Sequence, residues 1–564
     1  MEDDGDKLKT IVQNVACDVD RVNLLKFNIL GTVAMEQSKE HVHDHVEKSG
    51  DYETAQLAHI TDQEDHETGI YQSLIRNPWA SAWCIYGLWT VILLSFDVQA
   101  SGSVVGIPRF RQDFGYLFEG DYVLPAQWQS AFNGAPVAMA VISSLAAAEL
   151  ADIFGRKLML LVALVVSFVG VGVEFYATTN AVFFAGKLIN GIMVGIIATN
   201  MITYIGEIAP LALRGIFTCC IGVSYGIGPL VAFLIINYTG QVDSRWAYRS
   251  VFCSQFGFAA VALLLWPFMP ESPWFLAGKG RTEKALKSLR KLGYPGEEGE
   301  KKLALINLTL EQIRQETEGV TYVECFKKSN LRRTIISIMP LCIQSLSGIA
   351  FVAGYFTYYL QLAGYSTSMS YKIQISQPVL SIVGNIMAAA AVDSIGRRNI
   401  TFYGLIILTA ILLITGALGL SHKPSEIKGT VAFILIYSWW YNVSIGSTAF
   451  SLLAEVSTSR LRVKTIAIGY SVQSAITVMW QFVIPYLFNP DHANLGAKIA
   501  FIFFGFCVIC IVYLYFYQPE TAGRSYQELD EMFAKGVPAR KFKSYKTDIQ
   551  VQNEAAATAQ KSVV

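Results

Sequence analysis

Residues 152–157 read Asp-Ile-Phe-Gly-Arg-Lys, and residues 393–398, which begin 241 positions later, read Asp-Ser-Ile-Gly-Arg-Arg. A long segment nearly free of charge precedes each copy, and another follows it. A glycine followed by two cations favours a tight turn between two helices, because glycine adopts backbone conformations that other residues avoid. The recurrence of the pattern predicts that the chain contains two copies of one helical unit.

A second pair of signals repeats at a similar offset. Glu207 stands seven residues before Arg214, and Glu455, 248 positions later, stands seven residues before Arg462. Charge-assisted pairs between these acids and the arginines of the turns would hold one side of the molecule shut and would break when it opens. The alternative is that the arginines only set the orientation of the helices. The predicted gate consists of Asp152, Arg156, Glu207, Arg214, Asp393, Arg397, Glu455 and Arg462.

Uncharged runs dominate the rest of the chain. Of its 564 residues 53% are hydrophobic and 16% are charged, and the mean hydropathy is +0.39. A helix that crosses a bilayer needs about 20 residues nearly free of charge. The sequence therefore predicts an all-α membrane protein with twelve transmembrane helices in two six-helix halves. The predicted spans lie in 79–105, 121–149, 158–178, 187–207, 214–243, 249–271, the first half of 334–371, 372–393, 399–421, 428–455, 464–491 and 498–520.

The balance of charge bears on partners and orientation. Lys plus Arg and Asp plus Glu number 44 each, so there is no basic surface of the kind that binds nucleic acid. Positive residues gather in the loops on one side of the predicted bundle, which places both termini in the cytosol. The predicted parts are a disordered N-terminal tail (1–76), an N-terminal half (77–270), a linker with amphipathic helices (271–332), a C-terminal half (333–518) and a C-terminal tail (519–564).

The N-terminal tail carries a short run of histidines. His41, His43 and His45 are spaced by two residues and have no cysteine partner nearby in the pattern of a metal site. We interpret the run as a solvated polar stretch, and we expect no bound metal.

Several motifs resemble those of the sugar porters of the major facilitator superfamily. Besides the two turns and the spacing of Glu207 and Arg214, they are Pro270-Glu271-Ser272-Pro273-Trp274 and Pro519-Glu520-Thr521 with Gly523-Arg524-Ser525. Other stretches are similar to fungal α-glucoside permeases of the maltose type. These are residues 354–359, Tyr441-Asn442 to Gly446, 460–465, and 485–490 with 496–498. The resemblance covers about residues 79–535 and implies the major facilitator fold and a transport function.

Two ionisable residues inside the predicted spans need an explanation, because each costs roughly 2.5–3.5 kcal/mol to insert. The resemblance implies that Asp97 is the proton site, and Lys187 stands where the family usually has an arginine. Contact with Lys187 would favour the ionised acid and burial alone the protonated acid, so the pair would couple transport to protons. The alternatives are that Asp97 reaches headgroup water and that Lys187 extends to the membrane surface. Glu174, near a helix end, is expected to be solvated.

A sugar site needs amide groups for the hydroxyls and aromatic plates for the ring faces, near the middle of the bilayer. Gln344 fills the place of a glutamine in the family's seventh helix, whereas Ser345 and Ala350 replace amides there, which leaves room for a glycoside of another shape. For the remaining polar candidates the alternative role is hydrogen bonding between helices, and for Trp440 it is packing. The predicted binding residues are Gln129, Asn133, Gln344, Tyr355, Trp440, Asn442 and Gln473.

The expected function is proton-coupled uptake of an α-glucoside such as maltose across the plasma membrane, by alternating access in a monomer. Its partners are the sugar, the proton and the lipid bilayer, and no cofactor is expected. One alternative is a facilitative hexose or polyol uniporter in which Asp97 is only structural. Another is a non-transporting sugar sensor, although residues 518–564 are short for a signalling tail. The spans contain no hydrolase or metalloprotease motif, so no enzyme activity is expected.

Overall fold

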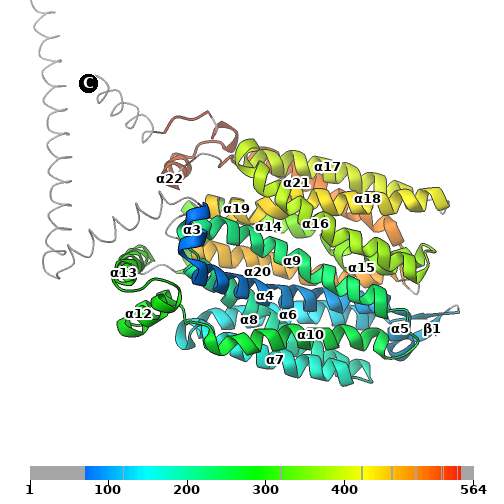
Figure 1. The fold of residues 1–564 in the computed structure, drawn as a ribbon. Coiled ribbons are helices and arrows are strands. Elements are labelled where there is room, and N and C mark those ends of the chain that lie inside the picture. The colour runs from blue at the N-terminus through cyan, green and yellow to red at the C-terminus, as the bar shows by residue number, and fades with distance from the viewer. Residues whose placement is uncertain are drawn as a thin grey trace, which may run out of the picture.

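The computed structural model describes residues 70–118, 120–317, 321–420, 423–458, 461–489, 492–521, 524, 526–542 and 544–547. The histidine run at 41–45 lies outside the described residues. Long helices run side by side and one two-stranded hairpin projects from an end of the bundle (Figure 1). Within the described residues, eleven helical stretches are long and apolar enough to cross a membrane, and two further helices, α18 and α19, follow one another as the remaining span. The predicted twelve-helix architecture is therefore confirmed.

The N-terminal half has six spans joined by short connections. Pro78 stands at the first turn of the first span, where its missing N–H costs nothing. Pro136 lies inside the second span, and neighbouring helices tolerate such prolines in membranes. The six spans are α4 (Pro78–Ser103), α6 (Ala126–Phe154), α7 (Arg156–Tyr176), α8 (Asn180–Ile208), α9 (Leu211–Thr239) and α10 (Trp246–Leu265).

The C-terminal half repeats this plan, with a proline at the corresponding place, Pro378. Two of its spans are broken into separate helices, which the sequence did not predict. The helices are α14 (Lys328–Leu346) with α15 (Ile349–Leu362), α16 (Thr367–Ile395), α17 (Arg397–Leu418), α18 (Pro424–Val443) with α19 (Ile445–Val456), α20 (Arg462–Phe488) and α21 (Ile499–Tyr517).

The two breaks interrupt the regular backbone geometry of these spans. Gly348, between α14 and α15, has φ 104°, a value that favours glycine, and an added Cβ would lie 3.0 Å from the Phe503 ring. Ser444, between α18 and α19, has φ −106° and ψ −109°. Broken helices leave backbone carbonyls free for other partners, which membrane proteins use at binding sites.

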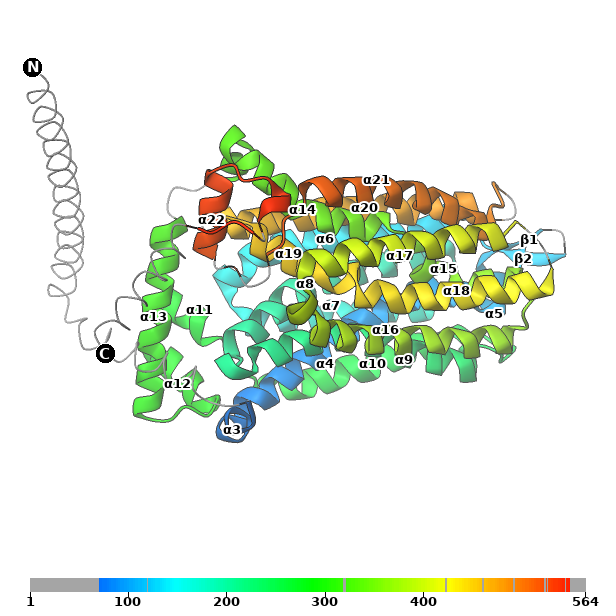
Figure 2. The same ribbon diagram turned by 90° about the horizontal axis from the view of Figure 1, so that it is seen from above.

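The two ends of the bundle differ, and Figure 2 shows them at opposite sides. We call one the linker end. It carries α3 (Ile70–Arg76), η2 (Trp266–Phe268), α11 (Pro273–Gly278), α12 (Thr282–Lys291), α13 (Glu297–Thr317), η3 (Tyr322–Phe326), α22 (Tyr526–Ala534) and η6 (Ala539–Lys541). We call the other the hairpin end. It carries η1 (Val104–Gly106), α5 (Pro108–Phe114), the antiparallel strands β1 (Tyr116–Phe118) and β2 (Asp121–Val123), and η5 (Gly496–Lys498).

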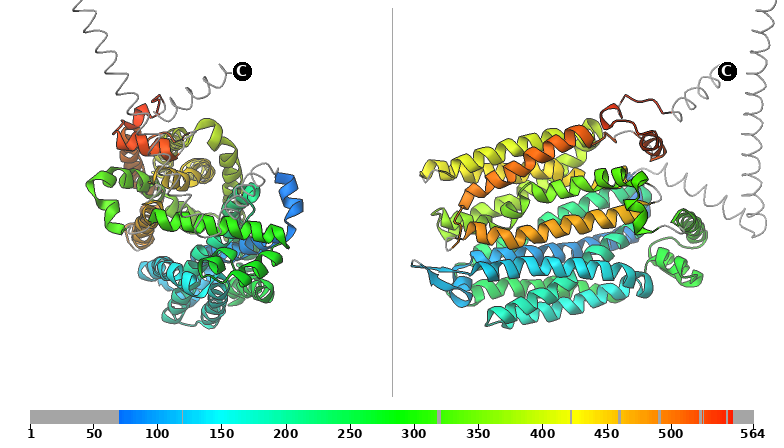
Figure 3. Two further views of the ribbon diagram at one scale, coloured as in Figure 1. Left: turned by 90° about the vertical axis from the view of Figure 1, so that its left-hand side faces the viewer. Right: turned by 180° about the vertical axis from the view of Figure 1, so that it is seen from behind.

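The halves form two groups of helices, as the end view in Figure 3 shows. Each half has its own buried apolar core, and the halves meet where α6 packs on α20 and α9 packs on α16. Small residues permit close packing within a half, since a Cβ at Gly191 of α8 would lie 2.6 Å from the Pro136 carbonyl of α6. Close packing of this kind fixes the polar side chains that lie between the helices.

Candidate transport site

Three ionisable side chains meet inside the N-terminal half, and we call them the charge cluster. Lys187 Nζ lies 3.4 Å from Asp97 Oδ1 and 2.9 Å from Glu174 Oε2. The side chains of Lys187 and Glu174 are 0% exposed, and that of Asp97 is 2% exposed. They come from three helices, α8, α4 and α7, so the cluster exists only because these helices pack together.

Polar and aromatic groups complete the charge cluster. Gln255 Nε2 of α10 donates a hydrogen bond to Asp97 Oδ1 (3.0 Å), and Asn190 Nδ2 donates one to Glu174 Oε1 (2.6 Å). The ring centroids of Phe183 and Phe252 lie 5.8 and 5.4 Å from Lys187 Nζ. Hydrogen bonds and ring faces of this kind offset part of the cost of removing charges from water.

The cluster corrects one expectation and excludes two of the alternatives. Glu174 is not solvated: it pairs with Lys187, and a Cβ at Gly186 would lie 2.6 Å from the Glu174 Cγ, so α8 covers it. Lys187 does not extend to the membrane surface, and Asp97 does not reach headgroup water, because both are buried. Proximity of Asp97 and Lys187 fits the predicted proton-coupling role, which stays a prediction.

A second polar group lies in the C-terminal half, where both broken spans meet α20. Gln473 Nε2 donates a hydrogen bond to Gln344 Oε1, and Gln344 Nε2 donates one to the Gly446 carbonyl (3.0 Å). The Tyr441 ring lies beside Gly446, since a Cβ added there would lie 3.0 Å from its Cε1, and the Tyr441 hydroxyl interacts with Gln344. We call Gln344, Gln473 and Tyr441 the amide group. It brings together two predicted binding residues and one aromatic ring.

Other predicted binding residues lie elsewhere in the C-terminal half. Trp440 Nε1 donates to the Gly404 carbonyl of α17 (3.1 Å), so the ring packs between helices. Asn442 Nδ2 donates to the Ser438 carbonyl of its own helix, and its Cβ lies against Gly384 of α16. Among the described residues, neither side chain hydrogen-bonds Gln344 or Gln473. A helix period identifies a face but does not identify the helix that the face meets, which explains why Tyr441 and not Trp440 reaches Gln344.

Gln129 also has a different place from that expected. It lies at the hairpin end of α6, fully buried, and its Nε2 donates to Asn489 Oδ1 of the C-terminal half (2.9 Å) and to the Leu124 carbonyl (2.8 Å). Asn133, one turn further along α6, is buried. Tyr355 belongs to α15, but its side chain is outside the described part of the chain.

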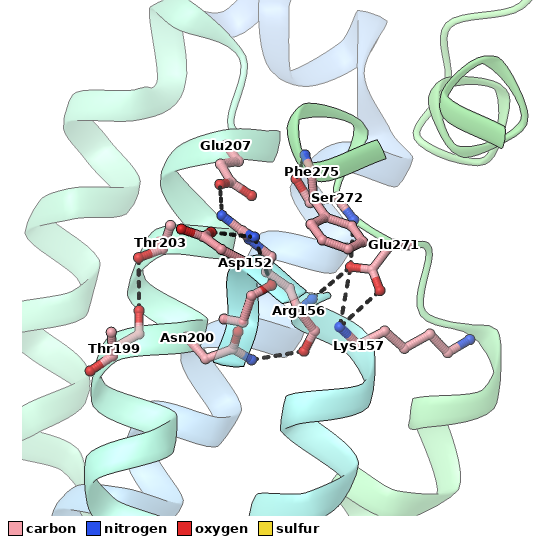
Figure 4. Close-up of polar contacts among 11 residues, drawn as sticks. Asp152, Arg156, Lys157, Thr199, Asn200, Thr203, Glu207, Glu271, Ser272 and Phe275 are labelled. Carbon is pink, nitrogen blue, oxygen red and sulfur yellow. Dashed lines mark hydrogen bonds and ion pairs between the residues drawn. The ribbon is translucent and has the colours of Figure 1, made fainter. Parts of the chain in front are cut away.

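The gate residues of the N-terminal half form a compact polar group at the linker end (Figure 4). Arg156 Nη2 lies 2.9 Å from Glu207 Oε1, and Arg156 Nη1 lies 3.0 Å from Asp152 Oδ1. Glu271 Oε1 accepts hydrogen bonds from the backbone N–H groups of Arg156 (2.9 Å) and Lys157 (3.2 Å). This carboxylate therefore caps the positive end of the α7 dipole.

The C-terminal half repeats the arrangement. Arg397 Nε lies 3.1 Å from Glu455 Oε1, whose other oxygen accepts from the Thr521 hydroxyl (2.6 Å). Glu520 Oε1 accepts from the Arg398 backbone N–H (3.4 Å), as Glu271 does in the first half. The two arginine–glutamate pairs predicted from the repeat are present in the structure.

Each of these pairs lies within one half, so the pairs brace the halves separately. Arg214 is exposed in the first turn of α9, and Arg462 begins α20. The side chain of Asp393, at the end of α16, is outside the described residues. Breakage of the pairs during opening stays a prediction.

Hydrogen bonds between the halves lie at the hairpin end. Arg111 Nη2 donates to Gln361 Oε1 (2.9 Å), and Gln361 and Tyr371 donate to the Gly106 carbonyl (2.7 and 3.2 Å). Together with the contact between Gln129 and Asn489, these bonds hold the hairpin end closed.

Sequence reasoning missed several of the residues in these groups. Gln255 and Asn190 gave no separate signal, although Asn190 stands one turn from Lys187 on a helix face. Glu271 and Glu520 were visible as the acids of the Pro-Glu-Ser and Pro-Glu-Thr motifs, but only the fold shows what they cap. Asn489 belongs to the motif at 485–490, which gave no hint of a contact with Gln129.

Comparisons with known proteins agree on one family. The family model "Sugar (and other) transporter" matches residues 83–533. The general alpha-glucoside permease of Saccharomyces cerevisiae is 28% identical over 502 residues, which cover 87% of this chain and 81% of the relative. The maltose permease MAL31 of the same organism is 30% identical over 523 residues, covering 90% and 84%.

Solved structures show the same fold. The inward-open xylose transporter XylE of E. coli has a TM-score of 0.66 at 20% identity, covering 80% of this chain and 99% of that one. The proton:xylose symporter XylE bound to 6-bromo-6-deoxy-D-glucose has a TM-score of 0.62 at 21% identity, covering 81% and 99%. With its duplicated halves, its twelve spans and the match of the family model, the chain is a multi-pass membrane protein that belongs to the sugar transporter family and has the major facilitator fold.

Proposed function

We propose that the protein is a proton-coupled carrier that takes up an α-glucoside across the plasma membrane by alternating access. The observation that carries this proposal is the burial of Lys187 between two carboxylates, Asp97 and Glu174. The relatives at 28–30% identity, an alpha-glucoside permease and a maltose permease, support the class of sugar.

The charge balance of the cluster favours proton binding. Two ionised carboxylates and one ammonium leave a net charge of −1 in a region without water access, and uncompensated buried charge is costly. One proton on either acid removes that charge while Lys187 keeps an ionised partner. The cluster therefore provides a site for one exchangeable proton.

The position of Asp97 connects this site with the closed end. Asp97 stands nine residues before Gly106, whose carbonyl accepts the hydrogen bonds of Gln361 and Tyr371 from the other half. The helix α4 with η1 joins the two places. When Asp97 gains or loses its proton, its attraction to Lys187 changes, and α4 transmits that change to the contacts that close the hairpin end.

The amide group provides the sugar site in this proposal. Gln344 and Gln473 supply carboxamide donors and acceptors, and Tyr441 supplies a hydroxyl and a ring face. The site lies at the two helix breaks, where Gln344 bonds the Gly446 carbonyl, and on the linker side of the closed contacts. Such a combination of amides and aromatic rings suits a ligand with many hydroxyls.

The experiment measures sugar accumulation and proton entry in a cell without other sugar carriers, with maltose as the first substrate. Asp97→Asn should abolish accumulation against a gradient but leave sugar exchange, because the variant can no longer release a proton. Glu149→Gln, which neutralises an exposed acid of α6, is the matched control and should accumulate sugar normally. Unchanged accumulation in Asp97→Asn would refute the coupling role of Asp97, whereas wild-type sugar uptake without accumulation or proton entry would favour a uniporter.

A further inference from the structure

Tyr225 of α9 points toward the interior, although it is 40% exposed. The exposed residues Ile216 and Leu234 are each nine positions from Tyr225, about two and a half helical turns, and so lie on the opposite face. On the two sides of α9 that lie between these faces, Gly226 packs against Ile382 of α16 and Gly228 packs against α4. The accessible surface of the Tyr225 ring is therefore on the side away from lipid.

Tyr470 of α20 has the same character in the other half. It is 41% exposed, and exposed Met479, nine positions later, lies on the opposite face. Gln473 and Thr477 lie on the same side of α20 as Tyr470. Gln473 hydrogen-bonds Gln344 of α14, and Thr477 hydrogen-bonds Ser345 of α14. The Tyr470 ring is thus accessible from the space between the halves, next to the amide group.

The two tyrosines approach each other from opposite halves. Their side chains are close enough to interact electrostatically. Among the described residues neither phenol makes a hydrogen bond, so both hydroxyls and part of both rings are available to a ligand. Because a large part of each ring is accessible, packing between helices does not account for the two aromatic side chains at this place.

We propose that Tyr225 and Tyr470 form an aromatic subsite for the second ring of a disaccharide whose first ring occupies the amide group. This inference rests on the proposed function and narrows it to glucosides of at least two rings. Residues three apart on a helix have Cβ atoms about 5–6 Å apart, so Tyr470 lies one sugar ring away from Gln473. Apolar ring faces of sugars pack on aromatic side chains. The amide group contains one aromatic side chain, that of Tyr441, so a second sugar ring needs aromatic partners outside it.

The test compares uptake of maltose with that of methyl α-D-glucoside, which has a single ring. Tyr225→Ala and Tyr470→Ala should each raise the KM for maltose at least about fivefold and change that for methyl α-D-glucoside less than about twofold. Tyr225→Phe and Tyr470→Phe keep the ring and should stay close to wild type. Met479→Ala, on the opposite face of α20, is the control for a truncated side chain.

Leu variants at both positions keep bulk without an aromatic ring, and they provide the same comparison if the Ala variants do not reach the membrane. Equal effects on both sugars, or no effect on maltose, would overturn the subsite while leaving the carrier function intact. Failure of the wild-type protein to take up any glucoside would instead overturn the proposed function, and the subsite with it.

Discussion

Lys187 holds two acids together in a place that water does not reach. Removing one member of a buried ionic group leaves the others without compensation, at a cost of about 3–5 kcal/mol. Lys187→Met should therefore lower the free energy of unfolding by about that amount, seen as a lower melting temperature of the purified protein in detergent.

The control at this scale removes every charge of the cluster. The triple variant Lys187→Met, Asp97→Asn, Glu174→Gln contains no uncompensated charge and should recover most of the lost stability, while losing coupled uptake. If Lys187→Met melts at the wild-type temperature, the cluster does not hold ionised acids in the folded protein.

At the scale of elements, the turns between paired helices depend on two glycines. Gly155 and Gly396 have φ of 95° and 94°, and a Cβ there would lie 2.5 and 2.6 Å from carboxylate oxygens of Glu271 and Glu520. Gly155→Ala and Gly396→Ala should each lower stability by about 1–3 kcal/mol from backbone strain alone, because essentially only glycine adopts this conformation. Displacing the carboxylate from the helix start adds to this cost.

Thermal unfolding of both variants measures this effect, and Gly206→Ala is the matched control. Gly206 lies within α8 and has nothing within 4 Å of the position of an added Cβ. Alanine there should be neutral or slightly stabilising. Equal melting temperatures for all three variants would contradict the role of the turns.

At the scale of the whole molecule, the hairpin end must open and close if the protein works by alternating access. Gln129 and Asn489 join the halves there through a 2.9 Å hydrogen bond. In a background without the nine native cysteines, Gln129→Cys with Asn489→Cys should be linked by a short reducible bifunctional thiol reagent. Uptake should fall by more than about tenfold and return after reduction, because the linked halves cannot separate.

Each single cysteine variant, treated in the same way, is the control and should keep its uptake. Full uptake by protein that is demonstrably cross-linked would show that the hairpin end need not open. A mass shift on denaturing gels after proteolysis in the linker establishes the degree of cross-linking.

The class of the molecule follows from its amino-acid sequence alone. Charge-free runs determine that helices cross a bilayer, since an inserted charge is costly wherever the helix lies. The repeated turns at 152–157 and 393–398 determined the duplication and the arginine–glutamate pairs, because both partners stand at fixed places in each copy. Asp97 and Lys187 stood out as charges inside spans for the same reason.

Which of these side chains meet depends on how the helices pack in three dimensions. Lys187 is 90 residues from Asp97 and 13 from Glu174, and neither separation indicates that one ammonium pairs with both. The breaks at Gly348 and Ser444 interrupt the helix period close to Gln344, which Tyr441 and not Trp440 contacts. Periodicity along a helix fixes the face on which a residue lies, whereas its partner depends on the packing of helices distant in the chain, which no local pattern encodes.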